Sequence, residues 1–123
     1  MRKVFTLSTC DTSKRILKPL DLSDFVIKDI KKDKITDEEL DTMHALAGSY
    51  EALFSRRSRS YGALGLKNKN LSEKNYRDYI LDDYTFLKRP VVIDGDQIFI
   101  GNQKSNVAEL YLHFDSVALR NQQ

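Results

Sequence analysis

The sequence predicts an α/β domain in which a β-α-β half and a β-β-α half are separated by a helical segment. Three observations support this fold class. An apolar run at residues 3–7 is followed by a polar turn and a stretch with helical spacing. Asp94-Gly95 stands between two apolar runs, which is a strong signal for a hairpin. Signals for helix starts occur in the region between them, at about 36–84.

The first half contains two predicted strands and one helix. Residues 3–7 are mostly β-branched or apolar and predict a short buried strand. A helix is expected from about Thr12, and Pro19 should kink or end it because proline lacks the backbone donor. Residues 25–30 predict the second strand. A right-handed crossover should make the two strands parallel.

The middle of the chain is expected to be helical. Thr36 and Glu39 form a T-x-x-E capping box that should begin a helix, and Gly48 should end or interrupt it. The segment 50–66 is expected to begin as a helix and then break near its glycines. A further helix is expected over about 72–83.

The second half is predicted to form a hairpin and a final helix. The strands are expected at 91–93 and 97–100, joined by Asp94-Gly95-Asp96. An amphipathic helix should follow, marked by Val107, Leu110, Tyr111 and Phe114. This order of elements is that of a thioredoxin-like domain. We therefore expect one domain over 1–123, with a helical insertion at about 36–84.

Composition narrows the possible classes of protein. The chain has 123 residues, 41% of them hydrophobic, which is enough for one core without disulfides or metals. A single cysteine argues against a secreted disulfide scaffold, and no run approaches the about 20 apolar residues that span a bilayer. We expect a cytoplasmic protein without membrane contact. A net charge of +2 gives no reason to expect direct nucleic-acid binding.

The only cysteine, Cys10, stands at the predicted junction of a strand and a helix. The first turn of a helix exposes backbone N–H groups and the positive end of the helix dipole, which together stabilise a thiolate. Thr12 and Ser13 can add hydroxyl donors. This position therefore favours a reactive thiol over the other interpretation, a buried cysteine that acts as a small hydrophobe.

Three segments carry a resemblance to a known family. They are the first strand with Cys10-Asp11-Thr12-Ser13, the segment "FLKRPVVIDGDQIFIGN" at 86–102, and "ALFSRRSRSYGALGL" at 52–66. Together they resemble the ArsC-type arsenate reductases, thioredoxin-like proteins whose family also includes the Spx regulators. The resemblance covers nearly the whole chain.

The resemblance implies a thiol oxidoreductase. Cys10 would attack an oxidised substrate, Arg89 would bind an oxyanion, and Pro90 would be the cis-proline beside the cysteine. The substrate would be a small oxyanion or an oxidised thiol. No cofactor would be bound, because glutathione as co-substrate, with glutaredoxin as partner, would complete the cycle.

Departures from the family pattern leave the substrate open. The reductases carry an arginine at the position that Ser55 occupies here, so this chain lacks it. The Spx branch carries an arginine at the position of Arg57. Arg57 is therefore the second candidate for anion binding. A third reductase arginine falls at Gly101, and Ser13 replaces the second cysteine of many Spx-type proteins. The alternative function is a Spx-like regulator that binds the RNA polymerase α subunit.

Two basic features have competing interpretations. The run Arg56–Arg59 is either a solvated face or a site for phosphate or nucleic acid, and total charge favours the solvated face. Arg89 either binds an anion or forms a structural ion pair with Asp94 or Asp96. One cysteine and two distant histidines give no expectation of a zinc site.

Overall fold

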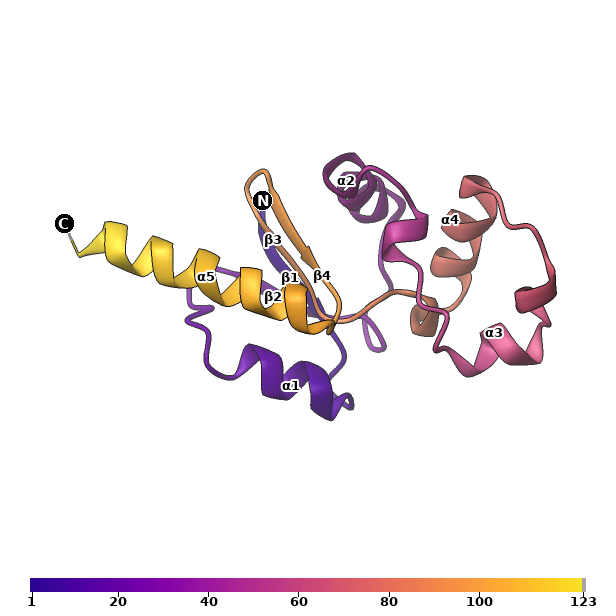
Figure 1. Ribbon diagram of the computed structural model, residues 1–123, viewed down its shortest axis with the longest axis horizontal. Helices are drawn as coiled ribbons and strands as arrows, with labels where there is room; N and C mark the ends of the chain where they lie inside the picture. The colour runs from indigo at the N-terminus through magenta and orange to yellow at the C-terminus, as the bar shows by residue number, and fades with distance from the viewer. Residues whose placement is uncertain (123) are drawn as a thin grey trace. The chain divides into compact units, whose positions relative to one another are not determined.

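The computed structural model of the protein, which describes residues 1–122, contains two compact units (Figure 1). The first unit comprises Met1–Asp29 together with the chain from Arg89 onward. The second comprises Ile30–Lys88, so the predicted helical insertion at about 36–84 lies within it. The predicted α/β class is confirmed.

The first unit is a four-stranded sheet with two helices. Its strands lie in the order β2-β1-β3-β4, with β1 and β2 parallel, as predicted, and the other pairs antiparallel. Its elements are β1 (Arg2–Thr6), α1 (Asp11–Leu17), β2 (Val26–Asp29), β3 (Val91–Asp94), β4 (Gln97–Ile100) and α5 (Lys104–Asn121). The two halves predicted from the sequence therefore join in one sheet.

One face of this sheet packs against α1 and α5. Val4 pairs with Val92, which pairs with Phe99, so the three side chains form a row across the strands. Ile16 of α1 and Leu110 of α5 cover this row, and all five residues are buried. The helices lie on this face because burial of each large apolar side chain contributes about 1.5–3 kcal/mol.

The hairpin and the end of α1 lie where the sequence places them. Gly95 has φ +64°, a left-handed conformation that favours glycine, and its N–H donates to the Met1 carbonyl at 2.9 Å. Helix α1 ends at Leu17, two residues before Pro19.

The second unit is built from short helices. They are α2 (Asp37–Ala47), α3 (Arg59–Ala63), α4 (Glu73–Asp82) and the short 3-10 helices η1 (Glu51–Leu53), η2 (Leu66–Asn68) and η3 (Tyr84–Phe86). The predicted capping box is confirmed: the Glu39 N–H donates to Thr36 Oγ1 at 3.1 Å, and the Thr36 N–H donates to Glu39 Oε1 at 2.9 Å. Gly48, with φ +89°, ends α2.

The prediction that 50–66 begins as a helix is largely wrong. Only the short 3-10 helix η1 forms at its start, because the chain at Phe54 then becomes extended and pairs with Leu87, and α3 begins only at Arg59. The Ser55 N–H donates to the Phe86 carbonyl at 2.7 Å, and the Lys88 N–H donates to the Leu53 carbonyl at 2.9 Å. Tertiary pairing thus replaces the local helical bonds.

Aromatic packing around Phe54 stabilises the second unit. Its ring centroid lies 5.1 Å from that of Phe86 in a stacked geometry and 4.9 Å from that of Tyr76. Phe54 and Phe86 are almost completely buried. No helix in the described part of the chain has both the length and the apolar character needed to cross a membrane.

Candidate functional site

Cys10 is the N-cap residue of α1. Its backbone is extended (φ −96°, ψ 105°), and its carbonyl accepts the Lys14 N–H at 3.1 Å. The turn before it is closed by a bond from the Cys10 N–H to the Leu7 carbonyl at 2.9 Å, and the Ser8 hydroxyl donates to Asp29 at the end of β2. The sulfur is therefore held at a helix start, as the sequence predicts, and the residue is partly exposed.

Ser13, three residues further on, faces the thiol from the first turn of α1. Its side chain is fully buried, and its hydroxyl has no partner in hydrogen-bond geometry among the described residues. The Cys10 sulfur is nevertheless close enough for this hydroxyl to affect its ionisation. A thiolate is a far better acceptor than a thiol, so ionisation of Cys10 gives the buried hydroxyl a partner.

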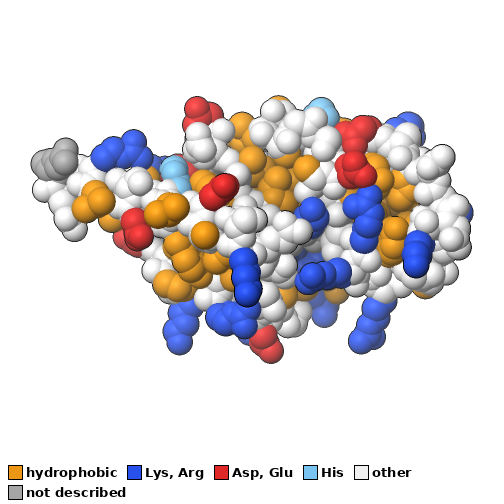
Figure 2. All heavy atoms as spheres, in the orientation of Figure 1, with side chains coloured by type: hydrophobic (Ala, Val, Ile, Leu, Met, Phe, Trp, Pro, Cys, Tyr) orange, Lys and Arg blue, Asp and Glu red, His pale blue; other side chains and the backbone are white. Residues whose placement is uncertain are grey.

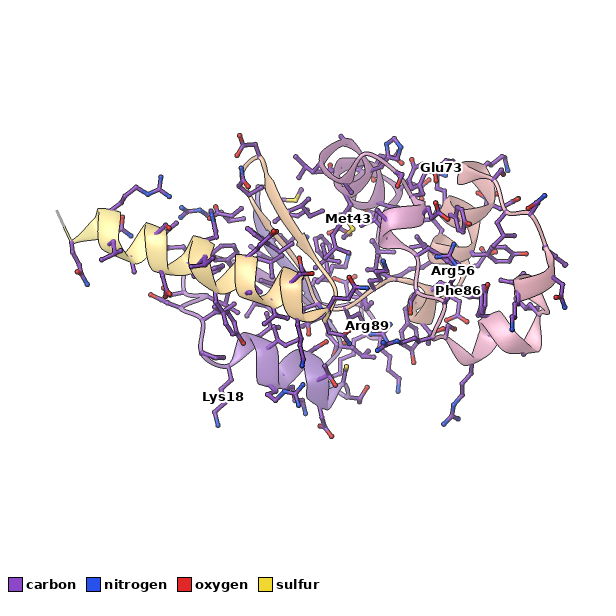
Figure 3. The ribbon with its side chains drawn as sticks, in the orientation of Figure 1. Lys18, Met43, Arg56, Glu73, Phe86 and Arg89 are labelled. Carbon is purple, nitrogen blue, oxygen red and sulfur yellow. The ribbon has the colours of Figure 1, made fainter. Side chains whose placement is uncertain are left out.

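Arg89 reaches the same end of the sheet from the opposite half of the chain. Phe5 of β1 pairs with Val91 of β3 in the antiparallel register. The residues just before Val91 therefore lie alongside the residues just after Phe5, which lead to Cys10. Arg89 precedes Pro90, and the peptide bond between them is cis. Figure 3 shows Arg89 at the start of this segment.

These groups lower the pKa of the Cys10 thiol from its ordinary value of 9.0. Partial burial raises the pKa, but the nearby hydroxyl and backbone N–H of Ser13 lower it because they favour the thiolate, and the positive charge of Arg89 lowers it further. Thr12 lies half-buried in the same helical turn. The site therefore combines a thiol whose ionisation is favoured with the guanidinium of Arg89.

Gly101 supports the segment that carries Arg89. Its N–H donates to the Pro90 carbonyl at 2.8 Å, and it is buried with φ +83°. This is the position at which the reductases resembled by the sequence carry a third arginine. In this chain Gly101 contributes its backbone N–H instead, and its positive φ disfavours any residue with a side chain.

The insertion arginines lie in the second unit and differ in their contacts. Arg56 donates to Glu51 at 2.8 Å and to the Tyr76 hydroxyl at 3.1 Å, and its guanidinium lies 6.0 Å from the Phe54 ring centroid. It is thus part of the packing around Phe54 (Figure 3). Arg57 is exposed, and within the described residues its guanidinium forms no hydrogen bond or ion pair. The role of Arg57 in anion binding stays a prediction.

Figure 2 shows lysine and arginine side chains spread over the face that it draws, with uncharged surface between many of them. The interpretation of Arg56–Arg59 as a solvated face stays a prediction, which the net charge of +2 favours.

Asp94, one of the two aspartates considered as alternative ion-pair partners of Arg89, pairs instead with Arg2 and His113. Asp94 Oδ1 accepts from Arg2 Nε at 3.0 Å, and Asp94 Oδ2 lies 2.8 Å from His113 Nε2. These three residues lie far apart in the sequence, and no local pattern connects them. The cluster at the hairpin end of β3 was therefore missed by sequence reasoning.

Comparison with protein-family models finds a match to the ArsC family over residues 5–110. The chain belongs to the ArsC family. This match covers the strand and helix that hold Cys10, the second unit, and the hairpin with the first part of α5. A comparison with curated protein sequences found no match.

Solved structures of the family share the fold. A putative arsenate reductase from Yersinia pestis superimposes with a TM-score of 0.72 at 16% identity, covering 89% of this chain and 99% of that one. An arsenate reductase from Vibrio cholerae gives 0.70 at 19% identity, covering 88% and 97%. A protein from Staphylococcus aureus COL gives 0.69 at 28% identity, covering 89% and 97%. The thioredoxin-like fold is confirmed, and family membership supports thiol-based oxidoreductase chemistry at the level of the family.

Proposed function

We propose that this protein is a thiol-dependent oxidoreductase in which Cys10 attacks a small oxyanion, of which arsenate is one example, or an oxidised thiol. The observation that carries the proposal is the position of Cys10 as N-cap of α1, where Ser13 and Arg89 outweigh the effect of burial and lower the pKa of the thiol. A nucleophilic thiolate and an oxyanion-binding guanidinium are the two groups that this reaction needs.

The reaction begins with a bond from Cys10 Sγ to the substrate. With arsenate, Sγ donates an electron pair to arsenic(V), and one oxygen takes up protons and leaves as water. Arg89 offers two parallel N–H donors to the remaining oxygens and offsets their negative charge. With a disulfide, Sγ attacks one sulfur, and the other leaves as a thiolate.

The cycle closes with thiols from other molecules, because Cys10 is the only cysteine in the chain. Glutathione attacks Sγ of the arsenic adduct. The sulfur–arsenic electron pair stays on arsenic, which is reduced to arsenic(III), and Cys10 is left in a mixed disulfide with glutathione. Glutaredoxin then attacks the glutathione sulfur and releases the Cys10 thiolate.

A coupled assay with arsenate, glutathione and glutaredoxin tests this function. We expect arsenite to form with the wild type and not with Cys10→Ser. A parallel incubation with glutathione disulfide, read by mass spectrometry, should add one glutathione to the wild type only. Absence of both turnover and glutathione addition in the wild type would contradict the proposal.

The alternative is a Spx-like regulator that binds the RNA polymerase α subunit. Two observations favour it: Arg57 is exposed without a side-chain partner among the described residues, and Gly101 stands where the reductases have an arginine. A pull-down with the C-terminal domain of the α subunit distinguishes the two functions. Binding that survives Cys10→Ser but is lost in Arg57→Ala, with Arg59→Ala as control, would favour the regulator.

A further inference from the structure

The corner between β4 and α5 is held by one side chain, Asn106. Asn106 Oδ1 accepts the Ile100 N–H at 3.0 Å, and Asn106 Nδ2 donates to the Gly101 carbonyl at 2.8 Å. The two backbone partners fix the orientation of the amide, because one requires an acceptor and the other a donor. Asn106 therefore bridges the last residue of β4 and the residue that follows it.

This corner connects directly to the segment that bears Arg89. Gly101, whose carbonyl is held by Asn106, donates its own N–H to the Pro90 carbonyl at 2.8 Å. The positive φ of Gly101 turns its two peptide groups in the directions that both bonds require. A continuous chain of hydrogen bonds thus runs from α5 through Gly101 to Pro90.

Arg89 precedes Pro90 and lies at the end of β3 that the register places near Cys10. We propose that Asn106 is a positioning residue, which acts through Gly101 and Pro90 to hold the guanidinium of Arg89 beside the Cys10 sulfur. The proposal rests on the proposed function only in taking Cys10 as the reactive group. It goes beyond that function because it assigns a role to a residue whose hydrogen bonds go to Ile100 and Gly101, and not to the sulfur or to Arg89.

Helix α5 also offers a matched control. The Tyr111 hydroxyl donates to the Ile16 carbonyl at 2.8 Å, so Tyr111→Phe removes one hydrogen bond between α5 and the rest of the first unit. Ile16 lies near the end of α1, six positions along the helix from Cys10, or about 9 Å. A general loosening of α5 should follow from either change, whereas displacement of Arg89 should follow only from loss of Asn106.

The experiment measures the rate of Cys10 alkylation by iodoacetamide as a function of pH. It compares the wild type with Asn106→Ala, Tyr111→Phe, Arg89→Ala and the double variant Asn106→Ala/Arg89→Ala. We expect Asn106→Ala to raise the thiol pKa by about half a unit, which lowers the rate about threefold at pH values below the pKa. Tyr111→Phe should leave the profile unchanged, and the double variant should match Arg89→Ala.

Two results would overturn the proposal. One is a pH profile of alkylation in Asn106→Ala that is the same as in the wild type. The other is a double variant whose shift in thiol pKa equals the sum of the shifts in Asn106→Ala and Arg89→Ala. If Asn106→Ala does not fold, Asn106→Ser carries the same test, because its shorter side chain cannot reach both backbone groups. Iodoacetamide needs no physiological substrate, so failure of the arsenate assay does not decide this result.

Discussion

The Ser13 hydroxyl links the stability of this protein to its reactivity. It is buried without a partner in hydrogen-bond geometry, yet it lowers the pKa of Cys10. A buried polar group without a partner costs about 1–3 kcal/mol, and ionisation of the neighbouring thiol removes that cost. A single residue can therefore destabilise the resting fold and stabilise the reactive thiolate.

Ser13→Ala should separate these two effects. We expect the variant to be about 1 kcal/mol more stable in urea unfolding at acidic pH, where the Cys10 thiol is protonated, because a methyl group replaces the buried and unpaired hydroxyl. Its Cys10 pKa should rise, and alkylation at neutral pH should slow severalfold. Thr12→Ala, in the same helical turn but half-buried, should change neither value much. A less stable Ser13→Ala with unchanged alkylation would show that the hydroxyl has neither role.

Arg89 sets the pH at which the thiol becomes reactive. Because the folded pKa of Cys10 lies below 9.0, the alkylation rate should rise with pH to a plateau, and the midpoint of the rise should lie below 9.0. Arg89→Ala should move this plateau to higher pH, and Arg89→Lys should move it less because a positive charge remains. Arg15→Ala, which removes an exposed arginine of α1, is the control and should leave the profile unchanged. Identical profiles for wild type and Arg89→Ala would rule out the role of this guanidinium.

The sign of the corresponding stability change follows from the lowered pKa. A thiolate favoured by the fold contributes stability that is fully present above the unfolded-state pKa of about 9, and this contribution is lost as pH falls through the folded value. Cys10→Ser should therefore lose more stability at alkaline pH than at pH 6. Urea unfolding at the two pH values measures the difference.

At the scale of the elements, the helices of the second unit depend on their caps. Helices α2 and α4 each begin with a complete capping box, at Thr36 and Ser72, and α2 ends at Gly48 in a left-handed conformation. The capping residues lie within three positions of one another in the sequence, and each helix begins directly after its N-cap residue. The segment after η1 lacks such a cap and follows its tertiary partner at Leu87 instead.

Thr36→Ala should destabilise the protein by about 1 kcal/mol, because the Glu39 N–H loses its acceptor and the capping box is broken. Thr42→Ala is a suitable control within the same helix. Thr42 donates only to the Glu38 carbonyl one turn earlier, and alanine has the higher helix propensity. Urea unfolding followed by circular dichroism should rank Thr36→Ala as clearly less stable than Thr42→Ala, and equal stabilities would contradict the role of the cap.

At the scale of the whole molecule, the first unit is tied together by segments from both ends of the chain. Asp94 of β3 binds Arg2 of β1 and His113 of α5. The Asp94 and His113 side chains are only 13% and 18% exposed. Partial burial raises the pKa of Asp94, but the hydrogen bonds from His113 and Arg2 lower it below its ordinary value. The carboxylate form therefore stabilises the folded sheet.

Asp94→Asn should cost about 1.5–3 kcal/mol at neutral pH, the usual range for hydrogen bonds to a charged partner. Because the folded pKa is below the unfolded value of about 3.8, this stabilisation is complete above pH 3.8 and is lost as pH falls through the folded pKa. The stability difference between wild type and Asp94→Asn should shrink in that acidic range. Asp96→Asn, at an exposed carboxylate, is the control. A difference that stays constant down to pH 2 would contradict this account.

The sequence by itself determined the local features of this protein. The Asp-Gly turn, the capping box at Thr36 and the strand-to-helix junction at Cys10 depend on residues that are close in the chain, so their patterns can be read directly. The family resemblance indicated Arg89 and Pro90 as companions of Cys10. Their placement together nevertheless depends on strand register, which the sequence does not state.

Only the tertiary structure decided which distant groups meet. It showed that Ser13 is buried and that Asp94 binds Arg2 and His113, not Arg89. It also placed Asn106 on the backbone at Gly101 and made the chain after η1 extended. Each of these outcomes depends on strand pairing and packing between segments far apart in the sequence. Local propensity carries no information about such pairings, because their free energy arises only when the sheet and its helices assemble.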